Sequence, residues 1–303
     1  MHHRKISALF IVGVPRSGTT LLRLMIDSHP EVAVPPETHF LPSLMNQCPR
    51  SDKPAERFIQ ILTSSPRWPD WHVDQNALEN AVKKLTPFSL DRAVQAFYRL
   101  YAARFGKTRW GDKTPGYLMH MKAIQQLLPE ARFIHVIRDG RDVCLSIRDL
   151  WWGPDTVEQA ALWWKKRIEL AGKQARALPH YKEVFFEDLV CEPEKTLKQI
   201  CAFTGIDWDP AMLKYYATAD RRIQELDHEV RQGDIKISPA RRRAIFSKVS
   251  SPPDMSRVHR WQTELSSEAH AVFLENAADM LRKLGYPLER RSVAQERKKG
   301  ITV

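Results

Sequence analysis

The stretch GVPRSGTT, residues 13–20, stands between an apolar run, Ile6 to Val12, and a helical pattern, Leu21 to Ile26. A glycine-rich turn between a buried strand and a helix presents successive backbone N–H groups and the positive end of the helix dipole, which together favour a bound phosphate. The stretch fits the Walker signature G-x-x-x-x-G-K-[ST] at both glycines and at Thr20, but Thr19 replaces the lysine of that signature. The turn therefore predicts a phosphate-bearing ligand that does not need this lysine.

The side chains of the turn add donors to its backbone groups. Arg16 supplies a fixed charge that can bond two anionic oxygens at once. Further donors, from backbone or hydroxyl groups, come from Ser17, Gly18, Thr19 and Thr20. The alternative is a tight turn that only caps the following helix, and the preceding strand argues against it.

Strand and helix patterns alternate along most of the chain, which is typical of a parallel sheet covered by helices on both faces. The expected strands are Ile6–Val12, Arg109–Asp112, Ala131–Ile137 and Tyr181–Phe186. The expected helices are Thr19–Ser28, Tyr117–Leu128, Arg141–Leu150, Asp155–Ala177, Glu194–Thr204 and Ser267–Leu284. We therefore expect an α/β fold, a P-loop-like parallel sheet flanked by helices.

Two regions depart from this alternation. Residues 48–105 have a wholly helical pattern, which predicts a helical insertion or lid. Residues 220–262 are charged, poor in periodicity and long for a compact domain, which predicts a flexible basic loop with a function. With a polar tail over residues 288–303, the chain is expected to form a single domain over residues 1–303.

Composition limits the class of protein. The chain is 43% hydrophobic and 27% charged, as an ordinary globular enzyme is. The early apolar run is too short to span a bilayer and no cleavage pattern follows it, so we expect a cytoplasmic protein without a membrane span. The four cysteines lack metal-ligand spacing, which predicts reduced, mostly buried thiols and no metal. The net charge of +11 suits a polyanionic ligand, but also nucleic acid or an acidic membrane.

A second pattern, VIRDGRDVCLS, occupies residues 136–146. Arg138 leaves the end of an expected strand, where ligands gather in open α/β sheets. Ser146 lies about two helical turns further on, so both side chains can face one anion. Taken alone, the pattern favours a purely structural interpretation. In that interpretation Arg138 pairs with a carboxylate, and Ser146 packs in the fold without binding a ligand. The strand also lacks the magnesium-holding aspartate of a Walker-B strand, which argues against a nucleoside triphosphate.

Together these patterns resemble the sulfotransferases that use 3′-phosphoadenylyl sulfate, especially the branch that contains tyrosylprotein sulfotransferases and many bacterial homologues. PRSGTTLLRLMIDSHPEV, residues 15–32, is similar to the 5′-phosphosulfate loop and helix of that family. VIRDGRDVCLS is similar to its 3′-phosphate motif. The supporting motifs GDKTP, FFEDLVCEPEKTL and RVHRW follow in the expected order, and the resemblance runs from about Ile6 to Leu284.

The resemblance implies a donor with a sulfonate on its 5′-phosphate and a separate 3′-phosphate. The turn at residues 13–20 would hold the first group, and Arg138 with Ser146 would hold the second. Phe186 stands where the tyrosylprotein enzymes carry a tyrosine against the adenine, and it can stack without the hydroxyl. Arg257 and Arg260, in RVHRW, would close over the 3′-phosphate, although ordinary surface arginines are an equal alternative. A nucleotide ligand would explain the net positive charge, so the charge does not require a nucleic-acid partner.

The resemblance also implies the catalytic groups. Glu37, in PPETHF, matches the glutamate that acts as base on the acceptor hydroxyl, and Lys113, in GDKTP, matches the lysine that neutralises the leaving phosphate. Arg16 would stabilise the sulfonate together with Lys113. His39 is the rival base, because the reference pKa of histidine lies closer to neutral pH. The alternatives are an exposed loop glutamate and a surface lysine.

We therefore expect a sulfotransferase that transfers a sulfuryl group to a hydroxyl, or alternatively an amine, of a small metabolite or glycan-like acceptor. The lack of a membrane anchor favours such an acceptor over a Golgi-type substrate. The alternatives are a P-loop small-molecule kinase, which Thr19 argues against, sulfation of protein tyrosine, and a basic nucleic-acid or membrane-surface protein. The sequence does not indicate the oligomeric state.

Overall fold

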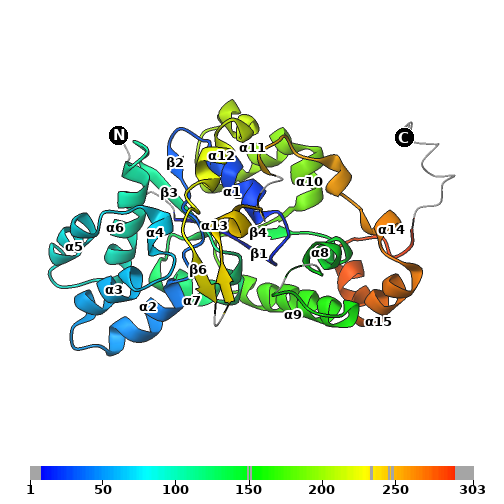
Figure 1. The fold of residues 1–303 in the computed structure, drawn as a ribbon, viewed down its shortest axis with the longest axis horizontal. Helices are drawn as coiled ribbons and strands as arrows, with labels where there is room; N and C mark the ends of the chain where they lie inside the picture. The colour runs from blue at the N-terminus through cyan, green and yellow to red at the C-terminus, as the bar shows by residue number, and fades with distance from the viewer. Residues whose placement is uncertain are drawn as a thin grey trace.

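The computed structural model describes residues 8–148, 150, 152–232, 235–244, 246 and 249–290. Its centre is a five-stranded parallel sheet in the order β2-β3-β1-β4-β5 (Figure 1). The strands are β1 (Leu9–Gly13), β2 (Val32–Ala33), β3 (Arg109–Lys113), β4 (Arg132–Ile137) and β5 (Tyr181–Phe185). The expected parallel sheet is thus confirmed, with β2 as an additional edge strand.

Both faces of the sheet are buried, as the continuous apolar sequence of β1 requires. Alternate residues of this strand point to opposite sides, so Phe10 and Val12 join one hydrophobic cluster while Leu9 and Ile11 join another. The β1 strand therefore stands between two cores, and the loop that follows it emerges at the carboxyl edge of the sheet.

The helices form a layer on each face. Residues of α1 (Thr19–Asp27), α10 (Phe186–Cys191), α11 (Pro193–Thr204), η3 (Pro210–Lys214) and α12 (Tyr216–Ile223) join the cluster of Leu9 and Ile11. Residues of η2 (Pro115–Met119), α7 (Met121–Leu127), α8 (Gly140–Ile147), α9 (Val157–Ala175) and α15 (Ser267–Lys283) join the cluster of Phe10 and Val12. The order along the chain places α1 and α8 directly after β1 and β4.

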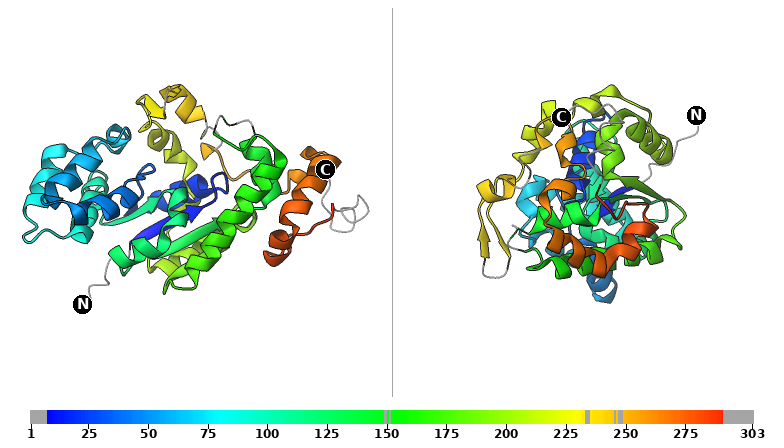
Figure 2. Two further views of the ribbon diagram at one scale, coloured as in Figure 1. Left: turned by 90° about the horizontal axis from the view of Figure 1, so that it is seen from below. Right: turned by 90° about the vertical axis from the view of Figure 1, so that its right-hand side faces the viewer.

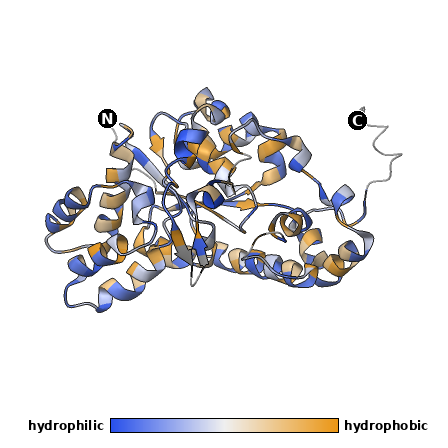
Figure 3. Cartoon of the chain, in the orientation of Figure 1, coloured by the Kyte–Doolittle hydropathy of each residue, from blue (hydrophilic) through white to orange (hydrophobic). Residues whose placement is uncertain are grey.

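Residues 48–105 are helical, as expected, and extend the molecule to one side of the sheet (Figures 1 and 2). After α2 (Leu41–Gln47) they comprise η1 (Cys48–Arg50), α3 (Pro54–Thr63), α4 (Trp68–Trp71), α5 (Gln75–Lys83) and α6 (Leu90–Ala103). Hydrophobic and hydrophilic residues alternate along these helices (Figure 3). The apolar sides pack through an aromatic cluster that stacks Tyr98 of α6 on Trp110 of β3, with the ring centroids 4.3 Å apart.

The expectation of a loop over residues 220–262 is wrong for much of its length. The segment begins within α12 and continues through β6 (Val230–Gln232), β7 (Ile235–Ile237), α13 (Pro239–Ala244), η5 (Met255–Arg257) and α14 (Trp261–Glu264). Its anchors include buried charges besides apolar side chains such as the fully buried Trp261: Arg222 is 3% exposed and pairs with Asp27 of α1, and Arg242 pairs with Asp70 of α4. Of the expected polar tail, residues 291–303 lie outside the described part of the chain.

The Arg242–Asp70 pair gives a test of this anchoring. Asp70 is fully buried, so Asp70→Ala leaves the guanidinium of Arg242 without its counter-charge in the interior. We expect the free energy of unfolding, measured by urea titration, to fall by about 3–5 kcal/mol. Glu79→Ala, which breaks the exposed pair with Lys83 on α5, is the control and should cost less than about 0.5 kcal/mol. Equal losses in the two variants would contradict a buried charged anchor.

Candidate active site

The turn at residues 13–20 is shaped by two close approaches. A Cβ atom on Gly13 would lie 2.6 Å from the carbonyl oxygen of Val136 in the neighbouring β4 strand. Gly18 begins α1 in the left-handed conformation, with φ of 93°, and a Cβ there would lie 2.3 Å from the ring of Phe186. Arg16 also has a positive φ, of 75°, which few residues other than glycine adopt. The two glycines thus let the turn fold tightly against β4 and α10.

The turn and the second motif meet, as the sequence predicts. Arg16 Nε donates to Ser146 Oγ of α8 at 3.1 Å. Arg138, at the end of β4, donates to the carbonyl oxygen of Arg16 at 3.1 Å and to that of Arg257 at 2.6 Å. Its guanidinium also lies over the ring of Phe186 and 3.7 Å from Asp142. Arg138 therefore has the carboxylate partner of the alternative interpretation, while Ser146 bonds to Arg16 rather than only packing.

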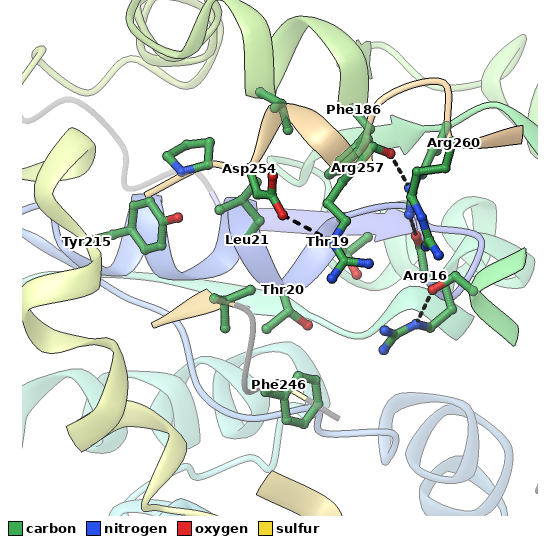
Figure 4. Close-up of a pocket in the computed structure, with 16 residues that line it drawn as sticks. Arg16, Thr19, Thr20, Leu21, Phe186, Tyr215, Phe246, Asp254, Arg257 and Arg260 are labelled. Carbon is green, nitrogen blue, oxygen red and sulfur yellow. Dashed lines mark hydrogen bonds and ion pairs between the residues drawn. The ribbon is translucent and has the colours of Figure 1, made fainter. Parts of the chain in front are cut away.

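A cavity, here called the loop cavity, lies against these groups (Figure 4). Its walls come from the turn, α1, α8, α10 and the segment after α12. It is lined by Arg16, Gly18, Thr19, Thr20, Leu21, Arg138, Ser146, Phe186, Val190, Tyr215, Phe246, Val249, Pro253, Asp254, Arg257 and Arg260. Of the residues expected to bind the donor, Ser17 lies outside the lining, since it is fully buried behind the turn.

The loop cavity is electropositive. Figure 4 shows Arg16, Arg257 and Arg260 with their guanidinium groups facing a common space. The pKa of Arg16 is lowered first by burial and then by the charges of Arg138 and Arg257, which is the effect of a positive potential at its guanidinium. Arg257 and Arg260 are partly neutralised by Asp254 and Glu264. An anion entering this cavity would meet a concentration of positive charge at the N-terminus of α1.

Three buried polar atoms at or beside this site have no hydrogen-bond partner within the described residues: Ser17 Oγ, Arg138 Nε and Asp142 Oδ2. Such atoms are costly in a dry interior. The first two are donors at the turn and at the end of β4, and Asp142 is the acidic neighbour of Arg138.

The second group of interest is an ion pair beside the loop cavity. Lys113, at the end of β3, is 2% exposed, and its Nζ lies 2.6 Å from Glu37 Oε1. The same ammonium donates to Thr20 Oγ1 at 3.3 Å, which links the pair to the cavity wall. The other carboxylate oxygen of Glu37 is 2.9 Å from His39 Nε2.

The protonation states follow from these contacts. Burial would raise the pKa of Glu37, but Lys113 and His39 together hold it well below its ordinary value. Burial lowers the pKa of Lys113, and the contact with Glu37 opposes this shift. Glu37 is therefore a carboxylate at neutral pH. This geometry joins Glu37, His39 and Lys113, so both proposed bases remain within reach of one reaction centre.

Beneath the pair lies a buried hydrogen-bond network that sequence reasoning missed. Thr38 Oγ1 donates to Asp112 Oδ2 at 2.7 Å, and Tyr98 OH donates to the same oxygen at 2.9 Å. Tyr117 OH lies 2.7 Å from Thr38 Oγ1. Thr38 follows Glu37 and Asp112 precedes Lys113 in the chain, so the network fixes the backbone on both sides of the ion pair. No local pattern marks Tyr98, because it comes from a helix of the insertion.

Thr38→Val tests this support. The substitution keeps the shape of the side chain but removes the bonds to Asp112 and Tyr117, so we expect a loss of about 1–3 kcal/mol in the free energy of unfolding. Turnover should fall as well, while nucleotide affinity, set in the loop cavity, should remain. Thr63→Val, which removes only a bond to the backbone of the same helix, is the control. A Thr38→Val protein with weakened nucleotide binding but normal turnover would contradict this role.

The described residues contain no cluster of three or more His, Cys, Asp or Glu side chains suited to a metal ion. No helix in the described part of the chain has the length and apolar character that a bilayer crossing requires. All four cysteines are free, and Cys48, Cys144 and Cys201 are buried.

Known proteins are similar to this chain in sequence and in fold. A model of the sulfotransferase family matches residues 8–210. Protein-tyrosine sulfotransferase A of Caenorhabditis elegans is 27% identical over 295 residues, covering 94% of this chain and 68% of that protein. Protein-tyrosine sulfotransferase 2 of Gallus gallus is 28% identical over 302 residues, covering 94% and 71%. In fold, the sulfotransferase domain of the Synechococcus PCC 7002 olefin synthase superposes with a TM-score of 0.60 and 22% identity, over 93% of this chain and 95% of that domain.

Proposed function

Because the chain belongs to the sulfotransferase family, we propose that it transfers a sulfuryl group from 3′-phosphoadenylyl sulfate to a hydroxyl group of an acceptor. The observation that carries this proposal is the meeting of the two anion-binding motifs in one electropositive cavity, with the Lys113–Glu37 pair linked to its wall through Thr20. A phosphate-type turn without the Walker lysine suits a donor whose reactive group is a sulfonate on a single 5′-phosphate.

The loop cavity offers a place for each part of the donor. The 5′-phosphosulfate would lie against the backbone of residues 13–20 and Arg16, at the N-terminus of α1. The 3′-phosphate would bind to Arg138 and Ser146, and Arg257 and Arg260, which line the same cavity, would add positive charge. The adenine would contact Phe186. Arg138, which lines the cavity and has an unpartnered Nε, supports an anion at this place.

The catalytic roles follow from the ion pair. Glu37 would accept the proton of the acceptor hydroxyl as its oxygen attacks sulfur. The new oxygen–sulfur bond forms while the bond between sulfur and the bridging phosphate oxygen breaks, which leaves adenosine 3′,5′-bisphosphate. Lys113, which touches both Thr20 and Glu37, would stabilise the charge that develops on the leaving oxygen. Arg16 would stabilise the sulfonate oxygens.

The choice of base rests on burial. Glu37 contacts Lys113 directly, whereas His39 has a side chain 45% exposed and is linked to Lys113 only through Glu37. We therefore assign proton transfer to Glu37 and a positioning role to His39.

A second candidate for the acceptor is protein tyrosine, since the curated relatives above carry that activity in their names. A small metabolite or glycan-like acceptor remains our first proposal, with an amine as a further option. A kinase function is disfavoured, because Thr19 replaces the lysine that triphosphate transfer needs.

The test is transfer of radiolabel from 3′-phosphoadenylyl sulfate to a pool of sugars, phenols, amines and tyrosyl peptides in the presence of EDTA. We expect label in an acceptor together with equimolar adenosine 3′,5′-bisphosphate. Phosphorylation of the same pool from magnesium ATP, without any sulfuryl transfer, would contradict the proposal.

A further inference from the structure

A second cavity, here called the α2–α3 cavity, opens beside the ion pair and has a volume of about 340 Å³. It is lined by Thr38, His39, Phe40, Ser43, Gln47, Arg57, Gln60, Ile61, Ser64 and Ser65. Its wall includes His39, whose ring bonds to the carboxylate of Glu37. Glu37 contacts Lys113, and Lys113 contacts Thr20 of the loop cavity. The ion pair therefore stands between the two cavities.

The chemistry of the α2–α3 cavity differs from that of the loop cavity. Most lining side chains are neutral hydroxyls or amides, while only Phe40 and Ile61 are apolar and no carboxylate takes part. Hydroxyl groups come from Ser43, Ser64 and Ser65. A purely apolar ligand would leave these groups without the hydrogen bonds that they make to water, which costs binding free energy.

Arg57 organises the polar wall. Its NH1 donates to Gln60 Oε1 at 2.7 Å, and its NH2 donates to Gln47 Oε1. Because both amide oxygens face the guanidinium, both amide Nε2 groups point away from it. Neither Nε2 has a hydrogen-bond partner within the described residues. Since both glutamines line the cavity, their amide groups, one on α2 and one on α3, can donate to a ligand oxygen.

This pattern selects among acceptor classes. A phenol or a steroid-like acceptor would meet too few apolar side chains. An acidic tyrosyl peptide would meet a single lining guanidinium, Arg57, whose NH1 and NH2 groups already bond to neutral amides. A sugar has adjacent hydroxyl groups that both donate and accept, which matches serine hydroxyls and amide Nε2 groups placed around a small polar cavity.

We propose that the α2–α3 cavity holds the acceptor and that the acceptor is a sugar, free or as the terminal residue of a glycan-like molecule. The inference rests on the proposed sulfuryl transfer. One sugar hydroxyl lies at Glu37, gives up its proton to that carboxylate and forms the bond to sulfur, while the remaining hydroxyls bond to Gln47, Gln60 and the serines.

The experiment measures radiolabel transfer from 3′-phosphoadenylyl sulfate to methyl glycosides of several hexoses and a hexuronic acid, to p-nitrophenol and to a tyrosyl peptide. We expect label in at least one glycoside. In the Gln47→Leu and Gln60→Leu variants, the KM for that glycoside should rise about tenfold or more. A change of this size is expected when one hydrogen bond is lost and its partner is left unpaired. Affinity for adenosine 3′,5′-bisphosphate, measured by calorimetry, should be unchanged.

Gln95→Leu is the matched control, since Gln95, like Gln60, accepts a bond from an arginine on its own helix but lines neither cavity. Its KM for the glycoside should equal that of the parent. The sugar proposal would be overturned if label appeared only in the phenol or the peptide, or if no glycoside were labelled although the nucleotide binds. It would also be overturned if both glutamine variants had the same KM for the glycoside as the parent protein. Failure of nucleotide binding and of all transfer would instead remove the proposed function itself.

Discussion

Glu37→Gln is expected to bind adenosine 3′,5′-bisphosphate as the parent protein does and to lose about two or more orders of magnitude in kcat, the usual scale of general-base catalysis. The amide keeps the shape of the side chain and can still accept a bond from Lys113, but it cannot take a proton. Glu31→Gln is the control: it removes the carboxylate that pairs with Arg109 and lines neither cavity, so its kcat should be normal.

The pH profile separates Glu37 from His39. The pKa of Glu37 is held well below its ordinary value of 4.5 by Lys113 and His39, against the effect of burial. A base must be deprotonated to act, so kcat/KM should stay level as the pH falls toward 5. A loss of rate already near neutral pH would instead indicate a different base. The assignment would be reversed if kcat/KM fell near neutral pH, the His39→Ala variant were inactive and the Glu37→Gln variant were fully active.

Lys113→Met is expected to lower kcat by about two to three orders of magnitude, since it removes a preorganised charge from the leaving oxygen in a buried site. It should also move the acid limb of kcat/KM to higher pH. Lys113 lowers the pKa of Glu37, and without it burial raises that pKa, so more of the base is protonated at a given pH.

Lys107→Met serves as the comparison for Lys113→Met. Lys107 donates to the carbonyl oxygens of Asp27 and Val32, away from both cavities, so its replacement should leave the pH profile in place. If Lys113→Met loses activity with an unmoved acid limb, Glu37 is not the group that titrates.

Much of the fold could be predicted because its signals are local. The apolar run before the glycine-rich turn, and the run before Arg138, each formed a central strand with a helix directly after it. The β2 strand has only two residues, Val32 and Ala33, and is too short to leave a pattern. The expected strand through Phe186 ends one residue earlier, and Phe186 begins α10, where it packs on Gly18.

The site was predictable to the extent that motifs carry their own geometry. Arg16 and Ser146 are 130 residues apart, yet both follow strands that pair in the sheet, so their contact could be anticipated. The polar network of Thr38, Tyr98 and Asp112 joins three elements that no local pattern relates. For the same reason Arg222 and Arg242 looked like loop charges, because Asp27 and Asp70, the carboxylates that anchor them to other elements, lie 195 and 172 residues away.

The central claim is that the loop cavity binds a nucleotide with a 3′-phosphate and a single 5′-phosphate. Isothermal titration calorimetry of the chain in EDTA tests it most directly. Adenosine 3′,5′-bisphosphate should bind and raise the melting temperature, since a ligand of the folded state stabilises it. Adenosine 5′-monophosphate should bind much more weakly, because it offers nothing to Arg138 and Ser146. Equal affinities for the two nucleotides, or tight binding of ATP only with magnesium, would contradict the claim.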